Sequence, residues 1–346
     1  MTQLNLFRPV VLLAISATLI AAIATSSANA TSSAYGPHSA RAKFKTPKLE
    51  DGVLTVKGTD AGEKIALRLQ AGNPGTLQID VRDDSTADFS VDRSKVTKIV
   101  VNAKGGNDAV RIDESNGPFT DTIPTTIDGG NGNDSIAGGK GIETLLGGRG
   151  NDSIDGNGGN DRSALGAGND TFIWDPGDGS DSVEGQSGAD TMVFNGANAA
   201  ETVDVSANGS RLKFFRNPGN VTMDTAGIER VDFNALGGAD TVTVNDLTGT
   251  GVSSFNVDLA GTLGGATGDG QADRVLVNGT NGNDAIDVSG DAAAVKVGGL
   301  AATTKVLHSE AGDRLEINTL AGSDTVQSNA LAAGAIRLLV DGAIVL

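Results

Sequence analysis

Acidic residues recur every nine positions in the middle of the chain, and their carboxylates are the side chains with the clearest chemical use. From Gly129 the sequence falls into successive nines, GGNGNDSIA, GGKGIETLL, GGRGNDSID, GNGGNDRSA and LGAGNDTFI, with an acid at the sixth position of each. After an eleven-residue step two further segments keep this phase, so the seven acids in register are Asp134, Glu143, Asp152, Asp161, Asp170, Asp181 and Asp190. Residues 128–190 carry twelve acids against three bases, a net charge of −9, and such mutual repulsion requires a cation among them.

The available donor atoms favour calcium as that cation. Carboxylate and carbonyl oxygens are hard ligands, and the nonapeptides contain neither His nor Cys. A flexible oxygen cage suits Ca²⁺ better than Zn²⁺ or Cu²⁺, whereas Mg²⁺ prefers to keep its waters. Glycines at positions one, two and four allow positive φ and a tight turn that exposes carbonyl oxygens. We therefore expect several Ca²⁺ ions at these turns.

The elements that position the acids follow from the apolar residue two places later. A three-residue strand centred there would point its middle side chain inward; these side chains are Ile136, Leu145, Ile154, Phe172, Val183 and Met192, with Ser163 as the exception. Two nonapeptides would make one coil of eighteen residues, so turns eighteen residues apart would stack. This arrangement places Asp134, Asp152 and Asp170 on one edge, and Glu143 and Asp161 on the other.

These segments resemble the RTX, or haemolysin-type, calcium-binding repeat GGxGxDxUx, most clearly at 129–137 and 147–155. The resemblance implies an all-β fold built on a right-handed parallel β-roll, with calcium held between successive turns by the sixth-position acid and by carbonyls of the glycine turn. Glu143 departs from the pattern because Ile142 takes the fifth place and the acid is longer. Carried over by position, the implied metal-site residues are Asp134, Asp152, Asp161, Asp170, Glu143, Asp181, Asp190, Gly130, Gly132, Gly148 and Gly150.

The flanks keep the step from an acid to an apolar residue two places later, at longer intervals; their acids are Glu63, Asp108, Glu201, Asp240, Asp284 and Asp324. Within each flank, the step from one of these acids to the next is more than twice the length of a nonapeptide coil, which indicates wider coils. We predict degenerate β-solenoid segments at 50–126 and 195–346 on either side of the calcium-binding β-roll at 127–194. For Asp108 and Asp284 a solvated turn is favoured over a calcium site, because no stacked partner lies eighteen residues away.

The N-terminal segment reads as a targeting signal. Residues 1–30 contain an apolar run from Pro9 to Ala24 and end in Ala28-Asn29-Ala30, which is typical of a signal peptide. The run is shorter than the ~20 residues of a membrane span, so we expect cleavage, no membrane span afterwards, and a secreted, extracellular or cell-surface location. Residues 31–49 have four bases, no acid and scattered Ser and Pro, and are predicted to be a disordered basic linker.

Composition narrows the function classes. The net charge of −17 disfavours a nucleic acid or an anionic membrane as partner. Zero Cys, two His, one Tyr and the lack of GxSxG or HExxH leave no recognisable catalytic constellation. The prediction is a non-enzymatic, secreted, calcium-binding structural or adhesive protein whose β-roll folds on Ca²⁺, with a cell-surface or matrix polymer as the further partner. The alternative is a polysaccharide-active β-helix enzyme, a lyase or an epimerase, which would need Arg, Lys, His and Tyr clustered in neighbouring coils.

Overall fold

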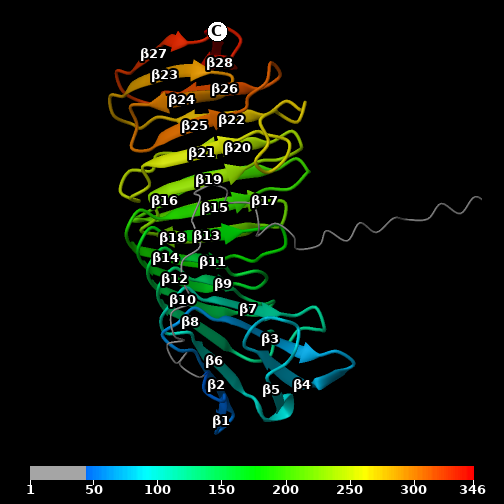
Figure 1. Cartoon of the computed structure of the whole chain (residues 1–346). Helices are drawn as coiled ribbons and strands as arrows, with labels where there is room; N and C mark the ends of the chain where they lie inside the picture. Colours follow the sequence, from blue (N-terminus) through cyan, green and yellow to red (C-terminus); the bar gives the residue numbers. More distant parts are fainter. Residues whose placement is uncertain (1–43) are drawn as a thin grey trace, which may run out of the picture. The chain divides into compact units, whose positions relative to one another are not determined.

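The computed structural model describes residues 44–346, in which the chain passes back and forth between two long sheets, with antiparallel hairpins inside each sheet (Figure 1). The first sheet has 15 strands in the order β1 (Lys48–Glu50), β2 (Val53–Lys57), β6 (Lys98–Asn102), β8 (Thr125–Asn131), β10 (Glu143–Arg149), β12 (Arg162–Ala167), β14 (Ser182–Ser187), β18 (Val221–Ala226), β17 (Arg211–Asn217), β16 (Thr202–Asn208), β20 (Thr241–Val244), β22 (Arg274–Asn278), β26 (Arg314–Asn318), β28 (Arg337–Val340) and β29 (Ala343–Ile344).

The second sheet has 14 strands, in the order β27 (Thr325–Leu331), β23 (Ala285–Asp291), β24 (Ala294–Gly298), β25 (Thr303–Leu307), β21 (Ser254–Asp258), β19 (Arg230–Asn234), β15 (Thr191–Asn195), β13 (Thr171–Trp174), β11 (Ser153–Asp155), β9 (Ser135–Ala137), β7 (Ala109–Asp113), β3 (Lys64–Gln70), β4 (Asn73–Asp80) and β5 (Phe89–Asp92). A short 3₁₀ turn, η1 (Arg93–Lys95), follows β5. The predicted all-β class and parallel β-roll are confirmed.

The nonapeptides form coils of the predicted length. Ile136 of β9 pairs with Ile154 of β11, and Ile154 pairs with Phe172 of β13, both eighteen residues apart and parallel. The next coil is two residues longer, since Phe172 pairs with Met192 of β15. Each of these apolar side chains is buried between the sheets, and burial of one contributes about 1.5–3 kcal/mol relative to exposure. Period-two alternation in short strands therefore builds the core.

Ser163 shows the cost of a polar residue in the inward row. It pairs between Leu145 and Val183, and its hydroxyl is buried without a hydrogen-bond partner. A buried hydroxyl without a partner carries a desolvation penalty of about 1–3 kcal/mol. The coil around β12 is thus weaker in packing than its neighbours.

Antiparallel hairpins widen the coils of the flanks. Strands β4 and β5 extend β3, strands β17 and β18 fold back from β16, and β24 lies antiparallel between β23 and β25. Between the parallel strands β16 and β20 the chain therefore travels much farther than in a nonapeptide coil, since Thr202 pairs with Thr241, and the wider coils of the prediction are found. The step from Asp240 to Asp284 is not a coil, however, because Asp240 precedes a strand of the first sheet and Asp284 a strand of the second.

An aromatic stack fills the core where the hairpin β17–β18 joins. The rings of Trp174 and Phe194 lie parallel with centroids 3.9 Å apart, and Phe214 of β17 packs on Phe194 at 4.3 Å. The Trp174 Nε1–H donates to the Gly179 carbonyl at 2.8 Å, so its polar atom is satisfied although the side chain is buried. Trp174 therefore serves packing.

The structure covers part of only one of the two N-terminal segments predicted from the sequence. The signal peptide at 1–30 lies outside the described residues. The linker prediction for 31–49 is wrong at its end, because Lys48 and Leu49 belong to β1, which pairs antiparallel with β2. The apolar side chains explain this, since Phe44 and Leu49 pack against the core.

The segment boundaries at 126/127 and 194/195 fall inside β8 and β15. The three predicted segments share both sheets and are stretches of one stack. Within residues 44–346 there is no helix long and apolar enough to cross a membrane.

Candidate metal centre

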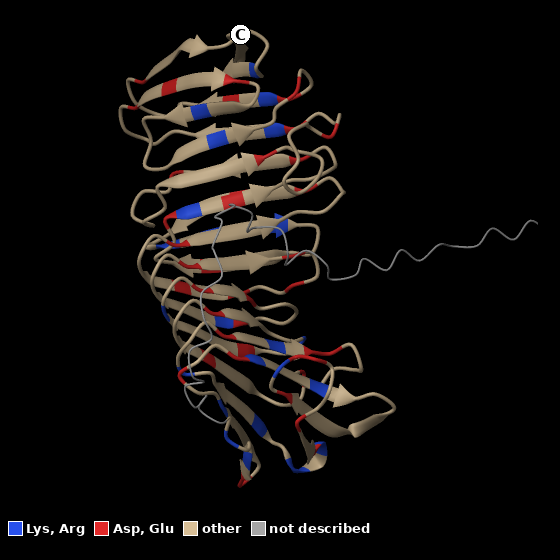
Figure 2. Ribbon diagram, in the orientation of Figure 1, with Lys and Arg blue, Asp and Glu red and all other residues tan. Residues whose placement is uncertain are grey.

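Acidic residues follow one edge of the stack, where the chain enters each strand of the second sheet. The backbone N–H of each acid donates to a carboxylate oxygen of the acid in the next coil: Asp134 to Asp152 at 2.8 Å, Asp152 to Asp170 at 2.8 Å, and Asp170 to Asp190 at 2.9 Å. All four side chains are buried. We call this edge the first ladder; many of the acids lie where strands meet turns (Figure 2).

A second ladder occupies the opposite edge, before strands of the first sheet. The Glu143 N–H donates to Asp161 Oδ1 and the Asp161 N–H to Asp181 Oδ1, both at 2.7 Å. These three side chains are also buried. The predicted division of the acids between two edges is therefore confirmed, and Asp181 and Asp190 join the ladders despite the longer coil.

Each ladder acid keeps one carboxylate oxygen without a partner. While Oδ1 accepts an N–H, the second oxygen is buried and unbonded; the atoms are Oδ2 of Asp134, Asp152, Asp161, Asp170, Asp181 and Asp190, and Oε1 of Glu143. In the described part of the chain none of these acids forms an ion pair with Lys or Arg. A buried anionic oxygen without a partner costs several kcal/mol, so these seven atoms point to a missing cation.

The unpartnered Oδ2 lies against the first glycine of the turn in four cases, which are those of Asp134, Asp152, Asp161 and Asp190. A Cβ built on Gly129 would be 2.5 Å from Asp134 Oδ2 and 2.8 Å from the Gly147 carbonyl oxygen, and one on Gly147 would be 2.6 Å from Asp152 Oδ2. Carboxylate and carbonyl oxygens from successive coils thus converge where no side chain fits. No three Asp, Glu or His side chains of residues 44–346 form a ligand group, so carbonyl oxygens must complete any coordination here.

The second and fourth turn positions require glycine for two reasons. Gly130, Gly132, Gly148 and Gly150 all have positive φ, between +104° and +122°. A Cβ on Gly148 or Gly150 would also overlap the carbonyl oxygen of Gly130 or Gly132 in the coil before. The predicted turn glycines therefore allow the coils to approach at the parallel strand spacing.

Gly150→Ala should destabilise the chain more than Gly177→Ala. Both glycines have φ +122°, which costs an L-residue about 1–2 kcal/mol, but a Cβ at Gly177 meets no atom within 4 Å. At Gly150 the clash with Gly132 adds about 1–3 kcal/mol. The free energy of unfolding in urea with calcium present measures both, and equal losses would contradict a close approach between coils.

An asparagine row beside the first ladder was not predicted from the sequence. The Asn151 N–H donates to Asn133 Oδ1 and the Asn169 N–H to Asn151 Oδ1, both at 2.8 Å. Asn107 extends the row, because its Oδ1 accepts the Asn133 N–H at 2.9 Å. The signal was the fifth-position Asn itself; exposed Ile142 leaves this contact unmade in the turn of Glu143.

The first ladder also extends beyond the nonapeptides. Asp108 donates its N–H to Asp134 Oδ1 at 2.7 Å and accepts the Glu63 N–H at 2.6 Å, while Asp190 donates to Glu229 at 2.8 Å. Asp108 is buried with an unpartnered Oδ2, so the prediction of a solvated turn at this residue is wrong. Its stacked partner lies farther along the chain than one nonapeptide coil, and the sequence Gly-Gly-Asn-Asp at 105–108 was the available signal. Asp284 is half-buried and bonds to Asp324 at 2.8 Å.

Burial without a counter-ion raises the pKa of the ladder carboxylates. Burial is the main cause at Asp161, whose pKa rises to about 9 with the charges of Glu143 and Asp181 adding to it. Burial likewise raises the pKa of Asp152 to about 6 and that of Asp181 to about 7, while the hydrogen bond from the preceding acid opposes the rise. In the metal-free folded chain each of these groups keeps its proton up to its raised pKa, whereas in the unfolded chain it ionises near pH 4.

This linkage gives calcium-free and calcium-bound chains opposite pH dependences. Without calcium, the free energy of unfolding should fall as pH rises from about 4, where unfolded Asp ionises, through the folded pKa values of about 6–9. With calcium, protonation of the carboxylates competes with binding. For each carboxylate that must lose a proton, the calcium midpoint should rise by up to about tenfold as the pH falls by one unit. Calcium titrations followed by circular dichroism at several pH values measure both, and a pH-independent midpoint would contradict carboxylate ligation.

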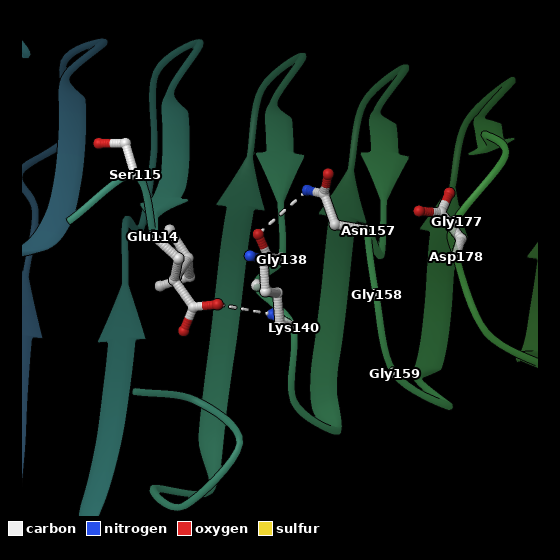
Figure 3. A pocket seen from close by; sticks show the side chains of 11 residues that line it. Glu114, Ser115, Gly138, Lys140, Asn157, Gly158, Gly159, Gly177 and Asp178 are labelled. Atoms are coloured by element: carbon white, nitrogen blue, oxygen red, sulfur yellow. Dashed lines mark hydrogen bonds between the residues drawn. The ribbon is translucent and has the colours of Figure 1, made fainter. Parts of the chain in front are cut away.

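A groove of about 670 Å³ runs beside the turns of the second ladder. Figure 3 shows the Lys140 N–H donating to Glu114 Oε2 at 3.0 Å and Asn157 Nδ2 donating to the Gly138 carbonyl at 3.1 Å. Asp178 lies at the far end, where burial first and then Asp155 and Asp175 raise its pKa to about 7. Five of the eleven lining residues are glycines, and Lys140 is the single base, so the groove offers backbone groups and one ammonium rather than a set of catalytic side chains.

The residues fit calcium, since hard oxygens, unpartnered buried carboxylate atoms and glycine turns too close for any side chain recur in each coil. The parallel strands and the oxygen donors at the turns are those of a β-roll whose turns can bind calcium. A family model of the RTX calcium-binding nonapeptide repeat (4 copies) matches residues 126–142, 138–172 and 177–198, about a fifth of the chain. Over these residues the chain is similar to RTX calcium-binding repeat proteins. A search of curated proteins finds no match to it.

Proposed function

We propose that this chain is a secreted structural or adhesive RTX protein whose β-roll folds when Ca²⁺ binds between its stacked turns. The observation that carries the proposal is the pair of ladders of buried acids with unpartnered carboxylate oxygens; at Asp134, Asp152 and Asp190 this oxygen lies beside a carbonyl of the next coil. The seven predicted acids and the turn glycines supply ligands on both edges. Calcium would then be part of the fold and not a cofactor of a reaction.

The role as a surface or matrix component rests on the way the sites are distributed. Ligands repeat along two edges, whereas an enzyme concentrates a nucleophile, acid and base in one cleft. In the groove of Figure 3, Lys140 is the single base among the lining residues, and Trp174 is buried and gives no stacking platform for a sugar. His308 Nδ1 lies 2.7 Å from Asp258 Oδ1, away from that groove's lining residues. These features favour the structural role over a polysaccharide lyase or epimerase.

The purified chain should bind an acidic polysaccharide in calcium without degrading it. Alginate and pectin gels are incubated with the protein in about 5 mM calcium or in EGTA, a range that spans extracellular site affinities. We expect calcium-dependent retention on the gel and no release of unsaturated or reducing ends. Depolymerisation that is abolished by a substitution outside the glycine turns, such as Lys140→Met, would establish the enzyme instead. Equal binding in calcium and EGTA would contradict calcium-dependent adhesion.

A further inference from the structure

A third set of stacked acids lies beyond the residues that the RTX family model matches. Glu201, Asp240, Asp273 and Asp313 precede β16, β20, β22 and β26, and all four side chains are buried. The Glu201 N–H donates to Asp240 Oδ1 at 2.7 Å, the Asp240 N–H to Asp273 Oδ1 at 2.8 Å, and the Asp273 N–H to Asp313 Oδ1 at 3.0 Å. We call this row the C-terminal ladder. It repeats the bonding of the nonapeptide ladders in longer coils.

Charge compensation differs along this ladder. Glu201 is paired with buried Arg216, whose Nε donates to Glu201 Oε1 at 2.7 Å. Asp240, Asp273 and Asp313 have no such partner among the ion pairs of the described residues, because Arg274 and Arg314 both bind Glu316. Asp240 is only 2% exposed, and its Oδ2 has no hydrogen-bond partner. An orphaned anionic oxygen therefore occurs here as it does in the nonapeptides.

Two further carboxylates reach the same place from neighbouring loops. Asp269 Oδ2 accepts the Gly238 N–H at 2.7 Å, two residues before Asp240. Glu310 Oε2 accepts the Gly270 N–H at 2.7 Å, and the Glu310 N–H donates to Asp313 Oδ2 at 2.6 Å. Burial, and then neighbouring acids that include Asp269, raise the pKa of Asp240 to about 7 and that of Asp273 to about 7.

The backbone before Asp240 has the form of a nonapeptide turn. Gly238 stands two residues before the acid with φ +130°, and a Cβ there would overlap Ala199 of the preceding coil. A groove of about 610 Å³, lined by Gly238, Asp269 and Gln271, opens beside this turn to solvent. The buried orphan oxygen, the glycine turn and a loop carboxylate thus lie next to an access path for an ion.

We propose that the C-terminal ladder holds a calcium site of its own, at the turn of Asp240 and Asp273 with Asp269 as the loop ligand. The donor set is oxygen throughout, which favours Ca²⁺ over transition metals. As in the nonapeptides, no three acids of the described chain already form a ligand group, so carbonyl oxygens supply the remaining ligands. Arg216 supplies a positive charge at Glu201, the first member of the ladder, whose Oε2 nevertheless has no hydrogen-bond partner.

The decisive variant is Asp240→Asn, compared with Asp246→Asn. The asparagine side chain keeps the Oδ1 acceptor for the Glu201 N–H and loses only the charge and the orphan oxygen, whereas Asp246 is exposed and bonds only within its own loop. Hydrogen exchange of the full chain is followed by mass spectrometry in calcium and in EGTA, with bound calcium counted by equilibrium dialysis. In the wild type, calcium should slow exchange about tenfold or more in peptides covering 235–245 and 265–275. Asp240→Asn should lose this protection and about one ion per chain; Asp246→Asn should lose neither.

The outcomes separate this site from the proposed function. Calcium protection of 129–136 and 147–154 without protection of 235–245 would overturn the new site and leave the nonapeptide proposal intact. Protection of 235–245 that persists in Asp240→Asn with an unchanged ion count would also overturn it. If calcium protects neither region, both proposals fail. Should Asp240→Asn not fold, Asp269→Asn in the half-buried loop tests the same site by the same loss of protection and of an ion.

Discussion

Removing calcium from the purified chain with EGTA should abolish most of the strand signal of residues 127–194 in circular dichroism. With site affinities of ~10⁻⁴ to 10⁻³ M, millimolar calcium contributes roughly 0.4–1.4 kcal/mol per site. One site is too weak to fold a coil, but several together reach several kcal/mol, which is comparable with the whole stability of a domain. The seven unpartnered carboxylate oxygens give the structural reason, because without a cation the folded coil buries them uncompensated.

The transition should also be steeply cooperative in calcium. Each ion would lie between two successive coils, and the hydrogen bonds of the ladders link these coils to the next ones. A titration from EGTA to about 5 mM calcium, with magnesium at the same concentration as control, measures midpoint and steepness. A spectrum that does not change over this range would contradict calcium-driven folding. Equal effects of magnesium would contradict a flexible oxygen cage.

Asp152→Ala should raise the calcium midpoint of folding more than Asp161→Ala, and Asp161→Ala more than Glu143→Ala. The Asp152 carboxylate accepts the N–H of Asp134, and the Asp152 backbone N–H donates to Asp170. Its replacement by Ala removes a carboxylate from the sites on both sides and breaks the bond that Oδ1 accepts, while the backbone bond to Asp170 remains. Asp161 also stands between two acids, but its turn reads Gly156-Asn157-Gly158-Gly159 and so lacks the glycine pattern of the repeat. Glu143 is the first member of its ladder, since its β8 partner is Thr125.

Asp152→Asn serves as the matched control for this ranking. Asn keeps the Oδ1 acceptor for the Asp134 N–H but removes the charge and the unpartnered oxygen. It should therefore raise the calcium midpoint nearly as much as Ala while costing less stability at saturating calcium. If Glu143→Ala shifts the midpoint more than Asp152→Ala, the positions of these acids within the ladders do not determine their contribution.

The stacking of the nonapeptides was predictable because a single period determines which acids share an edge and which side chains enter the core. Eighteen residues per coil place Asp134, Asp152 and Asp170 on one edge, and the apolar residue two places later enters the core; both follow from local pattern alone. The row of Asn133, Asn151 and Asn169 was visible in the same pattern. It was missed because its role depends on an amide side chain reaching the backbone of another coil.

The flanks were harder because their coils contain hairpins of variable length. The Asp240 N–H donates to Asp273, which has no glycine two residues before it, unlike most of the other stacked acids. In the sequence pattern, Asp284 is therefore the next acid after Asp240. Asp269 belongs to a loop and has no period at all. Spacing predicts a stack only while each coil has the same length, and three antiparallel insertions remove that condition here.

The hairpin β17–β18 has a consequence for how order spreads along the molecule. In a linear array each coil senses only its neighbours, so the range of cooperativity depends on the coupling at every junction. The first ladder crosses this junction through Asp190 and Glu229, but the second ends at Asp181 and the C-terminal ladder begins anew at Glu201, which Arg216 neutralises. Only the first of the two ladders therefore continues across the hairpin β17–β18. Order that calcium induces in the nonapeptides would therefore reach the C-terminal coils through one ladder instead of two, and we expect the two stretches to respond to the ion as partly independent units.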